Sequence, residues 1–525
     1  MVRIASTARG FGRRRFLQGT AATAGLAGAG LVLPAAFPRP AIAQGLRPWF
    51  THGLQAGDVG LDSAVVWARA DRASRLLIEW STTESFQQVT QVVGPAMLET
   101  SDLTAKQLLT GLPSGQTIFW RATLQDLADN AGLSEPLVGR FNTAPAEKRD
   151  LTFVWSGDTA GQGWGINLEW GGMKIYETMR QLRPDFFLHS GDTIYADGPI
   201  LPAVALPDGT VWKNVFIPEK AKVAETLDEF RGNYKYNLMD QNLMAFNAEV
   251  PMVAQWDDHE TTNNWYPNEV LATDDRYRVK NMALLAARAN RAFLEYMPVA
   301  EAETERARIY RKISYGPHLD LFVIDMRSYR GDNTANLEEA EVPFLGKPQL
   351  AWLLRGLKES KATWKAIAAD MPLGLQVPDG KTAWENQANG DGPALGREKE
   401  TAGLLKAIKD GGIRNVVWFT ADVHYTAAHY YDPDKAQFQD FLPFWEFVSG
   451  PLNAGTFGPN KLDNTFGPEV RYVKAPAEGQ VNLPPSAGMQ FFGHVAIAGE
   501  SGAMTVTLKD LANVDLFQVT LTPEA

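Results

Sequence analysis

Four short segments of the chain place acidic residues and histidine directly after apolar runs. Residues 253–265, VAQWDDHETTNNW, hold two aspartates, a histidine, a glutamate and two asparagines. Asp158 ends the run LTFVWSGD, Asp192 ends DFFLHSGD, and Asp422 and His424 end NVVWFTADVH. Burying an unpaired charge costs on the order of several kcal/mol per ion, so we expect groups of opposite charge to face these side chains.

These segments predict a site for metal ions. A single aspartate after a strand is more often a helix N-cap than a ligand, but four equivalent segments favour a shared site. Carboxylates that converge on one edge repel each other unless cations lie between them. Oxygen ligands together with imidazole suit Ca, Mg, Mn, Zn or Fe. We therefore expect two or more metal ions, with Asp192 bridging two of them, an arrangement that activates water and holds the oxygens of a displacement at phosphorus.

The elements that must position these residues alternate between apolar strands and helices. Helix-like stretches such as residues 171–184 separate the apolar runs, which is typical of an α/β domain with a buried sheet. Ligands of such sheets bind beyond the carboxyl ends of the strands. The runs that end on polar residues are 151–158, 185–192, 252–260, 319–327 and 415–424. The C-terminal residues 491–522 alternate apolar and polar positions and are expected to add antiparallel strands.

The segment before this domain has a different pattern. Residues 49–143 form short alternating runs separated by turn residues, which predicts a small β-sandwich of immunoglobulin or fibronectin type. Residues 142–150, NTAPAEKRD, form a plausible linker between the two parts.

The first 43 residues resemble an export signal of the twin-arginine type. Arg13 and Arg14 precede a weakly apolar stretch rich in Ala and Gly, and AIA at 41–43 offers small residues for cleavage. The alternative is a basic helix that anchors the chain in a membrane. No other run reaches the roughly 18 apolar residues of a membrane span. We expect a periplasmic or secreted protein without a stable membrane span, and the twin-arginine export machinery as a partner.

Charge and cysteine content exclude several classes of partner and ligand. The signal holds six of the 50 basic residues and no acid, so the mature chain has 44 basic and 61 acidic residues, a net charge of −17. This balance argues against nucleic-acid binding. The chain has no cysteine, so neither a disulfide nor a thiolate ligand is available.

The ordered blocks HSGDTIYADG, WDDHETTNNW, DLFVIDMRSYR and TADVHY resemble those of the PhoD-like alkaline phosphatase family, within the calcineurin-like metallophosphoesterases. GRFNTAP is similar to the family's N-terminal module, and the resemblance runs from about Phe50 to the C-terminus. It implies an α/β fold, a metallophosphoesterase β-sandwich flanked by helices and preceded by a small fibronectin- or Ig-like all-β domain. The expected boundaries are 1–43 for the signal, 46–145 for the N-terminal domain and 150–525 for the metallophosphoesterase domain.

The resemblance also implies roles for individual residues. His259 is expected to contact phosphate and assist the leaving group. Calcium and iron are the family's metals, but Asp158 stands where the family usually has a cysteine, which makes Mn or Zn possible. The implied metal ligands are Asp158, Asp192, Tyr195, Asp258, Asp422 and His424.

Other residues carry open alternatives. Asn263 and Asn264 are weaker candidates for substrate binding. Arg327 is a candidate catalytic contact to phosphate, because arginine binds phosphate in a bidentate manner; the alternative is a salt bridge with Asp325. Glu260 either orients His259 or forms a salt bridge along a helix.

Two loops are less informative. The loop 384–398 either covers the site or, as the favoured interpretation, is a plain surface loop. The Gly- and Asn-rich loop 449–460 is a candidate lining of the cleft.

We expect an exported metal-dependent phosphoesterase of the alkaline phosphatase type, which cleaves phosphate esters through attack of a metal-bound hydroxide. One alternative keeps the site and changes the substrate, giving a phosphodiesterase or phospholipase-D-like enzyme. Another is a non-catalytic calcium-binding surface protein, although pure calcium sites rarely use imidazole. A two-carboxylate glycosidase would not need these residues on separate strand ends.

Overall fold

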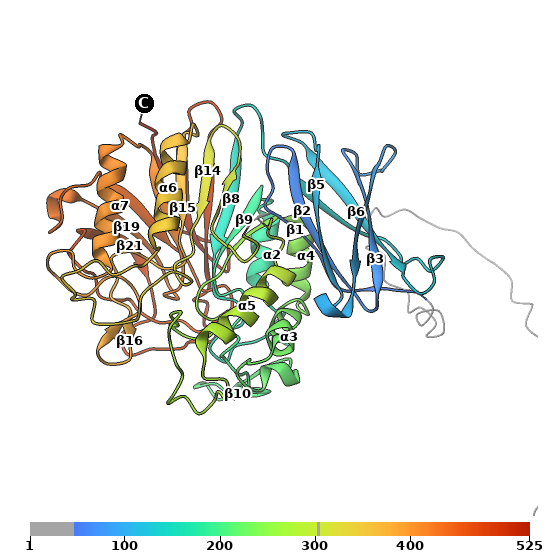
Figure 1. Cartoon of the computed structure of the whole chain (residues 1–525), viewed down its shortest axis with the longest axis horizontal. Helices are drawn as coiled ribbons and strands as arrows, with labels where there is room; N and C mark the ends of the chain where they lie inside the picture. Colours follow the sequence, from blue (N-terminus) through green and yellow to red (C-terminus); the bar gives the residue numbers. More distant parts are fainter. Residues whose placement is uncertain (1–46, 302–304, 525) are drawn as a thin grey trace, which may run out of the picture. The chain divides into compact units, whose positions relative to one another are not determined.

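The computed structural model describes residues 47–301 and 305–524, and the predicted export signal lies outside them. Within the described residues, two large sheets contribute side chains to one buried apolar cluster and therefore pack face to face. Figure 1 shows these sheets in the middle of the molecule, with helices beside them. Among the described residues, no helix combines the length and the apolar character needed to cross a membrane.

The first large sheet holds three of the predicted apolar strands side by side. β8, β9 and β12 pair in parallel, so their carboxyl ends meet at one edge. The C-terminal strands β22, β23 and β24 pair antiparallel, as the alternating pattern predicts. In order across the sheet the strands are β24 (Asp515–Leu521), β23 (Met504–Asp510), β22 (Phe491–Ile497), β8 (Leu151–Ser156), β9 (Phe186–Ser190), β12 (Met252–Gln255), β1 (Phe50–Gly57), β2 (Ser63–Ala70) and β5 (Thr104–Thr110).

The second large sheet holds the other predicted runs. β14, β15, β18 and β20 run parallel to one another. β13 adds to them antiparallel on one side, and β19 and then β21 add antiparallel on the other. Every residue of β9, β12 and β14 is buried, which explains why these strands are mostly apolar and do not alternate between apolar and polar positions. In order the strands are β13 (Arg311–Ser314), β14 (Leu319–Val323), β15 (Trp364–Ala368), β18 (Val416–Thr420), β20 (Phe444–Val448), β19 (Thr426–Tyr431) and β21 (Pro468–Lys474).

The N-terminal strands form the predicted all-β module. A third sheet runs in the order β4 (Thr90–Met97), β3 (Ser74–Ser81), β6 (Thr117–Asp126) and β7 (Leu137–Asn142). It shares its apolar cluster with β1, β2 and β5. β1 also bridges in parallel to β12 through Gly57 and Met252, so the N-terminal module continues the first large sheet. The domain boundaries at 145 and 150 stay a prediction.

Helices cover the outer faces of the two large sheets. One cluster joins the first sheet to α2 (Lys174–Gln181), α3 (Leu227–Asn237), α4 (Gln241–Glu249) and α5 (Met282–Tyr296). Another joins the second sheet to α6 (Lys347–Glu359) and α7 (Glu398–Asp410), which lie beside β15 and β19 in Figure 1. Two short hairpins complete the strands of the described residues: β10 (Ala203–Ala205) with β11 (Val211–Lys213), and β16 (Pro378–Asp379) with β17 (Ala383–Trp384). The result is a helix–sheet–sheet–helix arrangement.

Candidate metal centre

The loops that follow four strands bring the predicted acidic and histidine side chains together. Asp158 follows β8, Asp192 follows β9, and the pair Asp257 and Asp258 follows β12. Asp422 follows β18 of the other sheet, so the two packed sheets meet at this site.

The backbone at several of these positions is unusual. Asp158, Asp192, Asp422 and His424 have φ angles of 70°, 53°, 68° and 60°. Left-handed conformations are uncommon for residues other than glycine, although Asp and His tolerate them better than most. Such conformations persist where the surrounding structure over-determines them, and they cluster at functional sites. Tight turns at the strand ends therefore hold these side chains toward a common point.

The first group of possible ligands consists of Asp158, Asp192 and His424, whose ligand atoms lie within 4.8 Å of one another. The Tyr195 hydroxyl lies 2.8 Å from Nε2 of His424. On the other side of the ring, Nδ1 of His424 donates a hydrogen bond to the carbonyl of Gly455. This bond leaves Nε2 unprotonated and directed at the acidic residues, as a metal-binding imidazole requires.

Two further groups overlap with the first. Asp192, Asp258 and His259 form one of them, and Asp257, Asp258 and Asp422 form the other, each with ligand atoms within 4.8 Å of one another. Asp192 belongs to two groups, as expected of a bridging ligand, and Asp258 also belongs to two. Asp257 was recognised with Asp258 at the end of the same run but was not among the implied metal ligands.

The electrostatics of the centre fit cations. Among residues 47–301 and 305–524, neither carboxylate oxygen of Asp158 has a hydrogen-bond partner, and Oδ2 of Asp257 and Oδ1 of Asp258 have none either. Burial raises the pKa of Asp158 well above its usual range, and Asp257 raises it further. Burial, and next the charge of Asp258, also raises the pKa of Asp192 well above its usual range. Burial is again the main cause of the raised pKa of Asp422. Buried carboxylates with unpaired oxygens are the arrangement that positive charge stabilises.

His259 is oriented by a residue that the sequence analysis missed. Oδ1 of Asp197 lies 2.7 Å from Nδ1 of His259, and the Tyr195 ring stacks on the imidazole with centroids 4.2 Å apart. Burial alone would lower the pKa of His259, but Asp197 and Asp258 together raise it to about 10. Asp197 sits in the segment YADG, which looks like an ordinary turn, so the sequence offered only its nearness to Asp192 as a sign.

Glu260 does not take either of its expected roles. Its carboxylate accepts hydrogen bonds from the backbone N–H of Thr193 at 2.5 Å and from the backbone N–H of Asp257 at 2.8 Å. It therefore ties the loop after β9 to the loop after β12. The expected orientation of His259 by Glu260 was wrong, because Asp197 contacts Nδ1 of that histidine. The expected helical salt bridge was wrong too, because β12 is followed by turns instead of a helix.

The two predicted asparagines lie beside the centre. The backbone N–H of Asn264 donates to Oδ2 of Asp258 at 2.6 Å, and its side chain donates to Asp379 at 3.2 Å. The backbone N–H of Asn263 donates to Oδ2 of Asp197 at 2.9 Å. Their backbone groups thus fix the side chains of Asp258 and Asp197, and contact of their own side chains with a substrate stays a prediction.

Arg327 lies in a buried network of charges behind the centre. Its Nε donates to Oδ1 of Asp257 at 2.6 Å, and its guanidinium pairs with Glu385 and lies 3.6 Å from Asp370. The predicted salt bridge with Asp325 was wrong, because that carboxylate accepts from the Arg327 backbone instead. Within the described part of the chain Nη1 of Arg327 has no hydrogen-bond partner, and its contact with phosphate stays a prediction.

The loop that supplies Glu385 was interpreted wrongly. Residues 385–388 are buried, whereas the favoured interpretation was a plain surface loop. Asn389 of this loop donates to Asn336 and Glu398 and does not reach the centre in any described contact. The loop 449–460 does line the centre, because it supplies the Gly455 carbonyl to His424.

Comparisons with known proteins agree with this arrangement. A sequence model of the family described as PhoD-like phosphatase matches residues 153–508, and one described as PhoD-like phosphatase, N-terminal domain, matches residues 37–145. A search of curated proteins found no match.

Two solved structures share the fold. One, described as the structure of PhoD, is 20% identical, covers 90% of this chain and 89% of its own, and has a TM-score of 0.67. A purple acid phosphatase from yellow lupin (Lupinus luteus) seeds is 10% identical, with coverages of 91% and 74% and a TM-score of 0.55. At these identities the likeness shows the fold, and it confirms the predicted metallophosphoesterase architecture.

Proposed function

Because the chain belongs to the PhoD-like phosphatase family, we propose that this metal-dependent phosphoesterase is an exported alkaline phosphatase that hydrolyses phosphate esters. The observation that carries the proposal is the overlap of three groups of possible ligands at the ends of β8, β9, β12 and β18. Three adjoining groups that share Asp192 and Asp258 suit several cations held close together, which is what phosphoryl transfer needs.

The proposed ligands are the carboxylates of these groups and the imidazole of His424, with the Tyr195 hydroxyl beside it. Metal ions bound there would supply a hydroxide for attack on phosphorus and positive charge for the phosphoryl oxygens. Asp158 gives the first group oxygen and nitrogen donors alone, since the chain has no cysteine. Such donors admit Mn or Zn beside the calcium and iron that the family resemblance implies.

His259 is the proposed proton donor to the leaving oxygen. Its Nδ1 is occupied by Asp197 at 2.7 Å, while Nε2 lies 3.9 Å from Oδ2 of Asp258 and so faces the ligand groups. A histidine held in this way can give a proton at a fixed place when the ester bond breaks. Arg327 holds Asp257 by a short hydrogen bond and thereby keeps the loop after β12 in position.

The location of the protein follows from the N-terminal pattern. The twin-arginine motif at Arg13 and Arg14 supports export to the periplasm or beyond, with the twin-arginine machinery as the partner. The phosphate ester substrate would then be met outside the cytoplasm. The acidic net charge of the mature chain supports a partner other than nucleic acid.

The test compares hydrolysis of p-nitrophenyl phosphate and bis-p-nitrophenyl phosphate by the mature protein, each with and without a chelator. Turnover that the chelator abolishes and that favours the monoester is the expected result. Faster hydrolysis of the diester would show that the protein is a phosphodiesterase instead of a phosphatase. A folded, metal-loaded protein without turnover on either ester would refute the proposal and favour a calcium-binding surface protein.

A further inference from the structure

A cavity lies at the opposite end of the strands from the metal centre. It has a volume of about 370 Å³, and Val416 and Phe444, the first residues of β18 and β20, line it. Asp422 and His424 instead come after Thr420, the last residue of β18. The cavity is therefore separate from the metal centre, and its volume is within the range of small-molecule sites.

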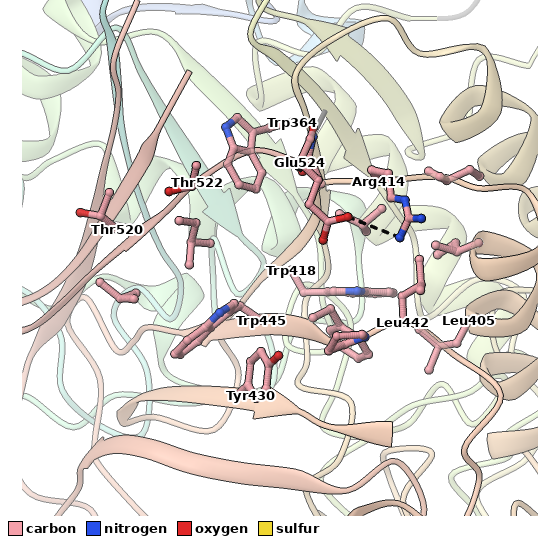
Figure 2. A pocket seen from close by; sticks show the side chains of 18 residues that line it. Trp364, Leu405, Arg414, Trp418, Tyr430, Leu442, Trp445, Thr520, Thr522 and Glu524 are labelled. Atoms are coloured by element: carbon pink, nitrogen blue, oxygen red, sulfur yellow. Dashed lines mark hydrogen bonds and ion pairs between the residues drawn. The ribbon is translucent and has the colours of Figure 1, made fainter. Parts of the chain in front are cut away.

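Aromatic rings form much of the cavity wall (Figure 2). Trp364, Trp418, Tyr430 and Trp445 come from four different strands of the second sheet. Tyr430 and Trp445 are half-buried, with ring centroids 5.2 Å apart and planes tilted by 57°. Partly exposed rings at fixed angles offer flat apolar faces with little conformational entropy to lose on binding.

The two charged side chains of the cavity have opposite signs. Of the described residues that line it, only Arg414 and Glu524 are charged, and their side chains lie 3.4 Å apart. The side chains are 47% and 65% exposed, so each can still bind a ligand. Asn415 holds the C-terminal segment in place, since it donates to the Glu524 carbonyl at 3.1 Å and accepts from the Glu524 N–H at 2.8 Å.

These opposite charges decide the charge of the ligand. A cation attracted by Glu524 would be repelled by Arg414 beside it and by the Arg471 guanidinium, which lies 5.1 Å from the centroid of the Tyr430 ring. An anion attracted by Arg414 would likewise be repelled by Glu524. A neutral molecule with both hydrogen-bond donors and acceptors is repelled by neither Arg414 nor Glu524.

We propose that the cavity binds a pyranose sugar. The C–H faces of a sugar ring pack against flat aromatic surfaces such as Trp445, while its hydroxyls donate to Glu524 and accept from Arg414. Such a site would attach the phosphoesterase to saccharide at a distance from the reacting phosphate. The proposal stands independently of the reaction at the metal centre.

The experiment is saturation-transfer-difference NMR on the full mature chain with methyl β-D-glucopyranoside as the probe. Choline and inorganic phosphate serve as the cationic and anionic comparison probes. We expect saturation of the sugar ring protons with a Kd on the order of 1 mM and weaker effects for both ions. Trp445→Ala and Glu524→Gln are each expected to weaken sugar binding by about tenfold, whereas Trp49→Ala, at an exposed tryptophan of the N-terminal module, leaves it unchanged.

The variants keep the test decisive. Glu524 is exposed, so Glu524→Gln should fold even if Trp445→Ala does not, and circular dichroism, which does not depend on ester turnover, checks that each variant is folded. Binding that survives Glu524→Gln undiminished, no saturation of the sugar, or stronger binding of choline or phosphate would each overturn the proposal.

Discussion

The contact between Asp197 and His259 offers a sharp test of the site. Oδ1 of Asp197 lies 2.7 Å from Nδ1 of His259, and Asp197 is 4% exposed. Asparagine has nearly the same shape, so Asp197→Asn removes the charge and keeps the packing. A carbonyl oxygen can still accept from Nδ1, but the ionic part of the bond is lost.

The size of the effect follows from this geometry. A hydrogen bond to a charged group contributes about 1.5–3 kcal/mol, and one pKa unit corresponds to about 1.4 kcal/mol. The variant should therefore lower the pKa of His259, which Asp197 and Asp258 raise to about 10 in the native protein, by about 1–2 units. If the transition state loses the same energy, kcat falls by about 10- to 100-fold.

The assay is kcat for p-nitrophenyl phosphate between about pH 6 and pH 10, with metal content measured on the same samples. Because the lower pKa deprotonates His259 earlier, the alkaline limb of the profile should move to lower pH. Asp208→Asn, in the exposed turn between β10 and β11, is the matched control. Native kcat and an unmoved alkaline limb in a metal-loaded Asp197→Asn protein would refute the role assigned to this pair.

Three other outcomes are expected. Asp192→Asn should lose bound metal and turnover together, because Asp192 belongs to two ligand groups; elemental analysis showing full metal content would contradict this. Arg327→Met should lower the free energy of unfolding by about 3–5 kcal/mol, since it leaves buried carboxylates unpaired. Arg276→Met, at an exposed arginine, should change it little, and urea unfolding of the metal-loaded proteins measures both effects. Removing metal should lower Tm by mass action. The raised pKa values of Asp158 and Asp192 mean that folding favours their protonated forms, so these groups destabilise the metal-free protein increasingly as pH rises above about 4. The Tm difference between loaded and metal-free protein should therefore widen from about pH 5 to pH 8. A constant difference would count against Asp158 and Asp192 as metal ligands.

Local patterns were enough to predict the strands and most of the centre. A buried parallel strand is apolar along most of its length, and the polar residue that follows its carboxyl end lies at the edge of the sheet where ligands bind. Asp158, Asp192, Asp258 and Asp422 were therefore placed by their own neighbours in the sequence. The alternating C-terminal residues likewise predicted the antiparallel strands β22 to β24.

Only the tertiary structure decided which partners these side chains have. Asp197 and His259 are 62 residues apart, and Arg327 and Glu385 are 58 apart, so no local pattern joins them. Glu260 bonds to backbone groups on two loops, a role that depends on how β9 and β12 pair. The packing of the two sheets brings Asp422 and His424 to the acidic residues of the other sheet. Sequence thus determined the chemical groups at each strand end, because those positions depend on burial along one strand. The orientation of those groups depended on contacts between distant segments, which only the folded chain brings together.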